Sequence, residues 1–257
     1  MAKPTRTDAD IQAGAPHPKT ARFMGIELEL APDVLVPREE TELLGRSAVD
    51  LLKGMAGSPV VIDMCCGSGN LALGIAAAIP AARLWASDLT ESTVSLARRN
   101  AERLGLLDRV KVVQGDLFSG LADEGLEGRV DLVVSNPPYI STSRLETDRA
   151  HLLENEPREA FDGGPYGLSI HQRLVREAPA FLKRGGWLAF EFGEGQERQV
   201  AILLKRAGMY EEPRFASDEA ASRASRLRAG SRSHDGYPPS GEGGYPGGSR
   251  SFPAHFP

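Results

Sequence analysis

The sequence VDLVVSNPPY, at residues 130–139, decides the fold class of this chain. Val130–Ser135 is a short, largely β-branched apolar run, which is typical of a strand buried on both faces of a sheet. Pro137 and Pro138 have no backbone N–H to donate, so the strand must end at Asn136. Open α/β sheets bind their ligands at the carboxyl ends of parallel strands. The stretch therefore predicts a buried strand that ends in a binding site.

The turn after this strand carries groups that could hold a planar NH2 group. Asn136 offers a side-chain carbonyl, Pro137 offers a backbone carbonyl, and Tyr139 offers a flat ring. Two acceptors match the two hydrogens of an NH2 group, and the ring could cover its plane. The same residues also fit an ordinary Pro-Pro loop in which an asparagine starts a turn, so the rest of the chain must distinguish the two interpretations.

Length and composition favour one α/β domain with tails. The chain has 257 residues, of which 41% are hydrophobic and 25% are charged. No apolar run is long enough for a membrane span and the N-terminal stretch has no apolar signal core, so we expect a cytoplasmic protein without a membrane partner. The net charge of −5 gives no general attraction for nucleic acid, although a local basic patch remains compatible with it. Cys65 and Cys66 are adjacent and lack the spaced partners of a zinc site, so no metal site is expected.

A glycine-rich loop follows the first strong strand. Val60–Asp63 predicts that strand, residues 64–70 form the loop, and a helix is expected from about Leu71 to Ile79. Glycines allow backbone N–H groups to approach a ligand closely. Asp88 ends the next strand, about 20 residues after Gly69. This is the spacing expected for an acidic residue that binds ribose hydroxyls. The loop alone would also fit a nicotinamide-dependent oxidoreductase.

Strands and helices alternate through the rest of the chain. Thr90 is suited to cap the helix after Asp88, and another helix should begin at Thr41. The further expected strands are Val110–Val113 and Trp187–Phe192, and the further expected helices are Leu168–Leu182 and Gln196–Ala207. This alternation predicts a largely parallel sheet with right-handed crossovers.

Several segments are less regular. Phe23–Leu30 and Val34–Val36 predict a short hairpin or an extended arm, and Ile140–Pro165 predicts a long functional loop over the site. Residues 214–216 and 225–228 could be two last strands. We expect residues 1–21 to be a mobile N-terminal segment, residues 22–229 to form the folded domain, and the Gly/Ser/Pro-rich residues 230–257 to be a disordered tail.

Taken together, these motifs resemble the class I S-adenosylmethionine-dependent methyltransferases. Within that class they are similar to the HemK/PrmC-type protein-(glutamine-N5) methyltransferases of peptide chain release factors. The similar positions run from about Phe23 to Gly208 and include Val36–Arg38, Thr41–Glu42, Asp63–Gly69, Asp88, Gly115–Asp116, Asn136–Tyr139, Glu156–Leu168, Gly185–Gly186, Glu191, Gly193 and Gln196. The resemblance implies a Rossmann-like α/β fold with a mostly parallel seven-stranded sheet and helices on both faces. The family usually has glycine at the position of Cys65, aspartate at that of Tyr166, and a helical N-terminal domain where about twenty polar residues stand here.

The resemblance also implies a role for each site residue, with S-adenosyl-L-methionine as the cofactor. Asn136, Pro137 and Tyr139 would hold the target amide, and Asn136 would also border the cofactor. The other implied cofactor positions are Asp63, Cys65, Cys66, Gly67, Ser68 and Gly69 for its methionine part, Asp88 for its ribose, and Asp116 and Leu117 for its adenine. For Asp116, an ordinary turn aspartate is the alternative.

The predicted reaction is N-methylation of a planar amide nitrogen. The resemblance implies a glutamine side chain of a protein such as a peptide chain release factor as the acceptor. An amide nitrogen is a poor nucleophile because its lone pair is conjugated, so the site must act by placement. Two alternatives remain: methylation of an exocyclic amine on a nucleic acid or small metabolite, and a cofactor-binding module without catalysis.

Overall fold

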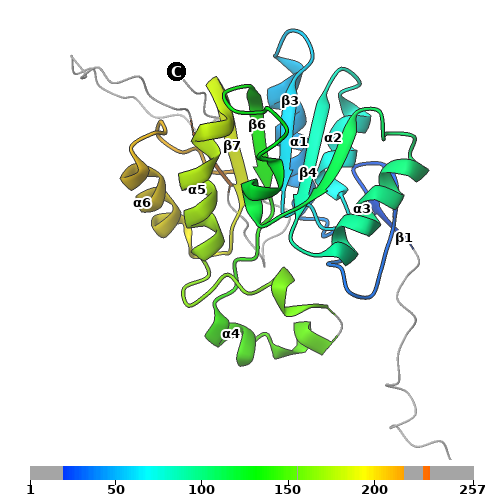
Figure 1. The fold of residues 1–257 in the computed structure, drawn as a ribbon. Coiled ribbons are helices and arrows are strands. Elements are labelled where there is room, and N and C mark those ends of the chain that lie inside the picture. Colours follow the sequence, from blue (N-terminus) through cyan, green and yellow to red (C-terminus); the bar gives the residue numbers. More distant parts are fainter. Residues whose placement is uncertain (1–19, 155, 217–227, 232–257) are drawn as a thin grey trace, which may run out of the picture.

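The structure is a computed structural model that describes residues 20–154, 156–216 and 228–231 (Figure 1). The strands are β1 (Thr20–Phe23), β2 (Ile26–Glu29), β3 (Val60–Met64), β4 (Arg83–Asp88), β5 (Val110–Gln114), β6 (Val130–Ser135), β7 (Leu182–Glu191) and β8 (Arg228–Ser231). The α-helices are α1 (Thr41–Lys53), α2 (Asn70–Ala78), α3 (Glu91–Arg103), α4 (Thr142–Glu146), α5 (Ser169–Phe181) and α6 (Glu197–Ala207). The 3-10 helices are η2 (Leu117–Leu121), η3 (Ala150–Glu154) and η4 (Arg158–Ala160).

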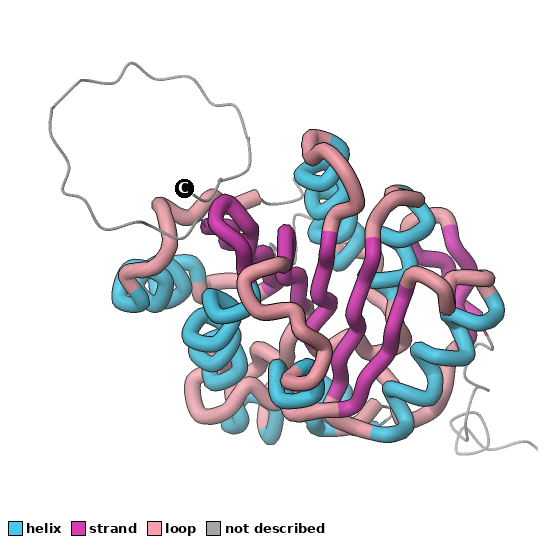
Figure 2. Tube along the Cα trace, turned by 45° about the horizontal axis from the view of Figure 1, so that its top comes forward, coloured by secondary structure: helices cyan, strands magenta, loops and turns pink. Residues whose placement is uncertain are grey.

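The main sheet has the strand order β5-β4-β3-β6-β7-β8 in the described part of the chain. Figure 2 shows strands of this sheet side by side, in magenta, with helices around them. The first five strands are parallel and β8 runs antiparallel to β7. The order reverses between β3 and β6, which are neighbours, so the loops that leave their carboxyl ends diverge and open a crevice. The loop that follows Met64 and the turn at Asn136 therefore face each other across this crevice.

Strand β6 confirms the prediction from the deciding stretch. All six of its residues are buried, and the strand ends immediately before Asn136. Ser135 Oγ donates a hydrogen bond to the Met64 carbonyl over 2.7 Å, which ties the end of β6 to the end of β3. The two loops thus start from strand ends that are buried and held together by a hydrogen bond.

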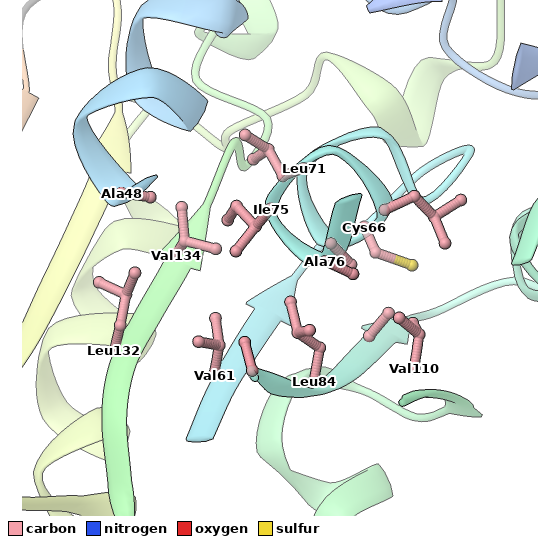
Figure 3. Close-up of a cluster of buried hydrophobic side chains, with 14 of the residues drawn as sticks. Ala48, Val61, Cys66, Leu71, Ile75, Ala76, Leu84, Val110, Leu132 and Val134 are labelled. Carbon is pink, nitrogen blue, oxygen red and sulfur yellow. The ribbon is translucent and has the colours of Figure 1, made fainter. Parts of the chain in front are cut away.

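Helices cover both faces of the sheet, as expected. Helices α1, α2 and α3 pack on one face, where Leu71, Ile75 and Ala76 of α2 meet Val61 and Val134 (Figure 3). Helices α5 and α6 and the 3-10 helix η2 pack on the other face. Burying a leucine or isoleucine side chain of this kind stabilises the fold by roughly 2 kcal/mol, so both layers hold the strand ends rigidly.

Two expectations about the N-terminal part are wrong. Phe23–Leu30 is not one extended run, because Met24 and Gly25 form a tight turn with positive φ angles of 48° and 85° between β1 and β2. Strand β1 begins at Thr20, just before the expected domain boundary. Val34–Val36 is not a strand.

Differences also occur in the second half of the chain. Strand β7 starts at Leu182, five residues before the expected start at Trp187, and it passes through Gly185 and Gly186, where its register with β6 shifts. The Ile140–Pro165 segment contains α4, η3 and η4, and it projects below the body in Figure 1. Residues 214–216 form no strand beyond one bridge residue, Arg214, so six strands of the expected seven are seen in the main sheet of the described residues. Residues 225–227 of the second expected strand, residues 1–19 of the N-terminal segment that we expected to be mobile, and residues 232–257 of the expected tail lie outside the described part.

A buried histidine makes the stability of this fold depend on pH. His171 of α5 is fully buried, and its Nε2 donates to the Glu191 carbonyl over 2.8 Å. Burial lowers the pKa of His171 from 6.5 to about 4, so the unfolded chain binds more protons than the folded chain between these values. Stability should therefore fall as the pH drops from 7 to 5, by about 2 kcal/mol from this group alone.

Comparison with a His171→Gln variant isolates this effect, because a glutamine amide can still donate to the Glu191 carbonyl but does not titrate. Urea unfolding at pH 7 and pH 5 should show that the free energy of unfolding falls more for the wild type than for the variant. Equal losses in the two proteins would contradict the burial argument.

Candidate functional site

Two cavities meet at Asn136, at the carboxyl end of β6. The first, the glycine-loop cavity, has a volume of about 620 Å³ and is lined by Cys65, Gly67, Asp88, Asp116, Leu117 and other residues. The second, the Tyr139 cavity, has a volume of about 460 Å³ and is lined by Arg38, Pro137, Tyr139, Arg144, Gly193 and others. Leu35, Asn136 and Ala160 line both cavities. A ligand in one cavity can therefore meet a ligand in the other at Asn136.

The glycine loop is held in a left-handed conformation. Cys65, Gly67 and Gly69 have φ angles of 60°, 54° and 82°. A Cβ atom on Gly67 would meet nothing within 4 Å, so this residue presents bare backbone to open space. A Cβ atom on Gly69 would lie only 3.3 Å from Ala97 Cβ, so this glycine allows α2 and α3 to pack closely. Close approach of a ligand to the loop backbone follows from this geometry.

Asp88 joins the loop to the next strand. Its Oδ2 accepts a hydrogen bond from Gly67 N over 2.8 Å. Its Oδ1 accepts from Leu89 N over 2.8 Å and from Thr93 Oγ1 over 3.0 Å. A carboxylate has about four lone-pair positions, so at least one remains for a hydroxyl donor in the cavity. Thr90 caps α3 as expected, because its side chain accepts from Thr93 N.

Four of the expected cofactor residues, one before the loop and three within it, are not among the described residues that line the cavity: Asp63, Cys66, Ser68 and Gly69. Asp63 Oδ2 accepts from Ala72 N over 2.9 Å, whereas Asp63 Oδ1 and Ser68 Oγ are buried without a partner in the described structure. Burial raises the pKa of Asp63 to about 8. Cysteine 66 packs in the core with its thiol buried. These residues shape the loop from beneath.

The far end of the glycine-loop cavity is formed by Asp116 and Leu117. The Asp116 carboxylate is exposed and pairs with Arg173 Nη1 over 2.7 Å. Leu117 is nearly buried and has a φ angle of 53°. An apolar wall beside a carboxylate suits a flat heterocycle with an amino group, such as the adenine that the family resemblance implies at this end.

The Tyr139 cavity rests on a buried polar network. Asn136 Nδ2 donates to Thr41 Oγ1 over 3.0 Å, and Thr41 Oγ1 donates to Glu191 Oε2 over 2.8 Å. Tyr139 OH donates to Glu191 Oε1 over 3.3 Å. The asparagine and tyrosine that border the cavity are thus fixed by one carboxylate behind them. Sequence reasoning noted Thr41 and Glu191 as similar positions but gave them no role.

Gln196 holds the backbone of the same turn. Its Nε2 donates to the carbonyls of Tyr139 over 3.0 Å and Gly167 over 3.3 Å, and its Oε1 accepts from Gly193 N over 2.8 Å. The turn is also closed from the opposite side, because a Cβ atom on Gly167 would lie 2.3 Å from the Tyr139 carbonyl. Tyr139 therefore has little freedom to move out of the cavity.

Glu156 links the two segments that cover the crevice. Its Oε1 accepts from Val36 N over 2.9 Å, and its Oε2 pairs with Arg38. The side chain is 8% exposed. The Val36–Arg38 segment is thereby fastened to the loop after β6, and both segments contribute to the walls of the cavities.

The left-handed conformation of Cys65 carries a cost that a substitution can measure. A residue with a Cβ atom loses about 1 kcal/mol in this region, whereas glycine does not. We expect Cys65→Gly to be more stable than Cys65→Ala by about 1 kcal/mol in urea unfolding. Cys66 is not among the described residues with positive φ, so Cys66→Gly should be less stable than Cys66→Ala. If the glycine and alanine variants had the same order of stability at positions 65 and 66, the backbone strain assigned to Cys65 would be contradicted.

No helix in residues 20–154, 156–216 or 228–231 is long and apolar enough to cross a membrane. In the same ranges, no group of three or more His, Cys, Asp or Glu side chains is arranged to hold a metal ion.

Comparison with known sequences gives consistent matches. A family model described as "Methyltransferase small domain" matches residues 47–165. A release factor glutamine methyltransferase of Geobacter sulfurreducens is 39% identical over 189 residues, which cover 74% of this chain and 63% of the relative. The Moorella thermoacetica protein of the same name is 37% identical over 198 residues, covering 77% and 68%. A 4-amino-L-phenylalanine/4-methylamino-L-phenylalanine methyltransferase of Streptomyces pristinaespiralis is 37% identical over 194 residues, covering 74% and 64%.

The chain spans 63 to 68% of the length of these three relatives. Among solved structures, a methyltransferase from Pyrococcus furiosus matches with a TM-score of 0.56 and 21% identity, over 80% of this chain and 88% of that one. The METTL16 methyltransferase domain matches with a TM-score of 0.62 and 17% identity, over 82% and 75%. These likenesses confirm the Rossmann-like class I methyltransferase fold.

Proposed function

Because this chain belongs to the family of the release factor glutamine methyltransferases, we propose that it methylates the side-chain amide nitrogen of a glutamine in a protein, and that this protein is a peptide chain release factor. The observation that carries the proposal is the position of Asn136, which lines both cavities. The family model matches residues 47–165, and this range includes both loops of the crevice. Methyl transfer needs two ligands that meet at one point, and the crevice provides that point.

The glycine-loop cavity fits the cofactor of the family, S-adenosyl-L-methionine. The loop presents bare backbone at Gly67, Asp88 keeps a lone pair for a ribose hydroxyl, and the Leu117 wall suits an adenine ring. The unpartnered Asp63 Oδ1 lies beneath the part of the loop assigned to the positively charged methionine end. When bound, the cofactor supplies an electrophilic methyl group whose sulfur keeps the bonding electrons as the methyl leaves.

The residues of the Tyr139 cavity place the acceptor nitrogen. Asn136 Oδ1 and the Pro137 carbonyl can accept the two hydrogens of the amide NH2 group, and the Tyr139 ring can cover its plane. Positive charge develops on the nitrogen as its bond to the methyl group forms, and the two carbonyl oxygens stabilise that charge. The methylated amide is then a strong acid, and it releases one proton to water.

The shape of the Tyr139 cavity favours an acceptor that enters from outside. Arg144 and Arg149 line the cavity, and both belong to the segment after β6 that carries α4. This segment projects from the body of the protein (Figure 1). A loop of another protein could place one glutamine side chain in a cavity of about 460 Å³. This fit supports a protein acceptor.

The test uses a purified peptide chain release factor and S-adenosylmethionine with a labelled methyl group. The expected product is one labelled glutamine, recovered as N5-methylglutamine after digestion. An unlabelled release factor, together with transfer of the labelled methyl group to an acceptor other than a protein in a cell extract, would overturn the acceptor assignment.

A second acceptor is favoured by one of the relatives. The Streptomyces pristinaespiralis relative is named for methylation of 4-amino-L-phenylalanine, whose amine is also attached to a planar group. The same pair of carbonyl oxygens would hold such an amine, and a nucleobase amine would fit for the same reason. Incubation with 4-amino-L-phenylalanine and with total RNA, followed by mass spectrometry, distinguishes these acceptors from a release factor.

A further inference from the structure

We propose that Glu191 is a positioning residue that sets the direction of the hydrogen bonds made by Thr41, Asn136 and Tyr139 behind the acceptor site. Through Thr41 it forces Asn136 to present its carbonyl oxygen, so the site selects acceptor groups that donate hydrogens. The inference rests on the proposed function in one respect, that the acceptor nitrogen sits beside Asn136.

Glu191 and Thr41 lie behind the site. They are 2% and 0% exposed, respectively, and neither lines the Tyr139 cavity or the glycine-loop cavity. Glu191 is the last residue of β7 and Thr41 is the first residue of α1. Two elements distant in the sequence therefore meet beneath the end of β6.

The recorded hydrogen bonds among the three groups fix the arrangement of their hydrogens. Thr41 Oγ1 donates its single proton to Glu191 Oε2. Thr41 can then offer only a lone pair to Asn136, and the partner must be Nδ2, the donor end of the amide. The acceptor end, Oδ1, is left to face the other way. Tyr139 OH also gives its proton to Glu191.

This polarity has a consequence for acceptor choice. An NH2 group of an amide or arylamine presents hydrogens and matches Oδ1. A ring nitrogen or carbonyl oxygen with its lone pair in the plane would face a second lone pair, and a buried mismatch of this kind is strongly disfavoured. The site should therefore reject acceptors that lack an N–H group, even when they have the right shape.

The variants Thr41→Val and Thr41→Ser test the inference. Valine keeps the shape of threonine but offers no lone pair to Asn136, whereas serine keeps the hydroxyl. We expect kcat for transfer to the release factor to fall at least 10-fold in Thr41→Val and to stay within about threefold in Thr41→Ser. A change in KM with an unaltered kcat would overturn the positioning role. Glu191→Gln should also lower kcat. The glutamine NH2 group cannot accept a hydrogen bond, so either Thr41 or Tyr139 would have to accept a hydrogen bond from it and could no longer donate one there.

A second measurement needs no acceptor. In ¹⁵N NMR spectra, the side-chain NH2 signal of Asn136, assigned by its loss in Asn136→Asp, should shift and exchange faster with water in Thr41→Val than in wild type or Thr41→Ser. An unchanged signal would overturn the inference whatever the acceptor is. If the NMR result holds but the wild type methylates no release factor, the proposed function fails and the inference stands.

Discussion

Replacing Asn136 by alanine should lower kcat for methyl transfer about 100- to 1,000-fold while the affinity for S-adenosylmethionine changes only a few-fold. The side chain provides one of the two oxygens that orient the acceptor nitrogen, and this interaction strengthens as charge develops on that nitrogen. The backbone carbonyl of Pro137 remains, so some activity should persist. Single-turnover transfer with labelled cofactor, together with calorimetric titration of the cofactor, measures the two effects separately.

The control for this variant is Gln199→Ala. Gln199 is an exposed amide on α6 that lines neither cavity, so its loss should leave both kcat and cofactor affinity unchanged. A melting temperature of the Asn136 variant close to that of the wild type would show that the fold is retained. Full activity in Asn136→Ala would exclude the role assigned to the side-chain oxygen of Asn136.

The parts of the fold that the sequence predicted are those encoded by contiguous residues. The buried strand at Val130–Ser135 follows from an unbroken apolar run and two prolines. The cap at Thr90 follows from one residue and its position before a helix. The glycine loop and Asp88 follow from a fixed spacing. In each case, a short window of sequence contains the physical cause.

The errors arose where the cause lies elsewhere in the chain. Gly185–Gly186 was expected to end a helix region and precede the strand, but a Cβ atom on Gly186 would lie 2.7 Å from the Val130 carbonyl. Glycine is needed there because β7 passes close to β6, and only the assembled sheet shows this. In the N-terminal hairpin, the alternation of Phe23–Leu30 concealed the turn, although Gly25 was a visible signal.

The acceptor network could not be found from local sequence for the same reason. Asn136 and Thr41 are 95 positions apart, and Thr41 and Glu191 are 150 positions apart. A threonine at a helix start and a glutamate at a strand end each have ordinary explanations. Their role depends on the proton order among the three groups, which requires the positions of all of them.

The second large effect is expected at Asp88. The variant Asp88→Asn keeps the shape of the side chain but should weaken S-adenosylmethionine binding about 10- to 100-fold and lower stability by about 1 kcal/mol. Three donors converge on the native carboxylate: Gly67 N, Leu89 N and Thr93 Oγ1. An amide has one oxygen, so its NH2 group would meet at least one of these donors and the loop would lose its anchor.

The control is Asp50→Asn. It removes an exposed carboxylate that pairs with Lys53 Nζ over 3.3 Å, and it should change neither the affinity for S-adenosylmethionine nor the stability. Calorimetric titration with S-adenosylmethionine and with its demethylated product distinguishes two causes of weaker binding. If Asp88 holds the ribose, both ligands lose the same factor, because they share that part. A loss confined to the methylated form would mean that Asp88 acts on the charged sulfur instead, and the glycine-loop cavity would then have to bind the cofactor in the opposite direction.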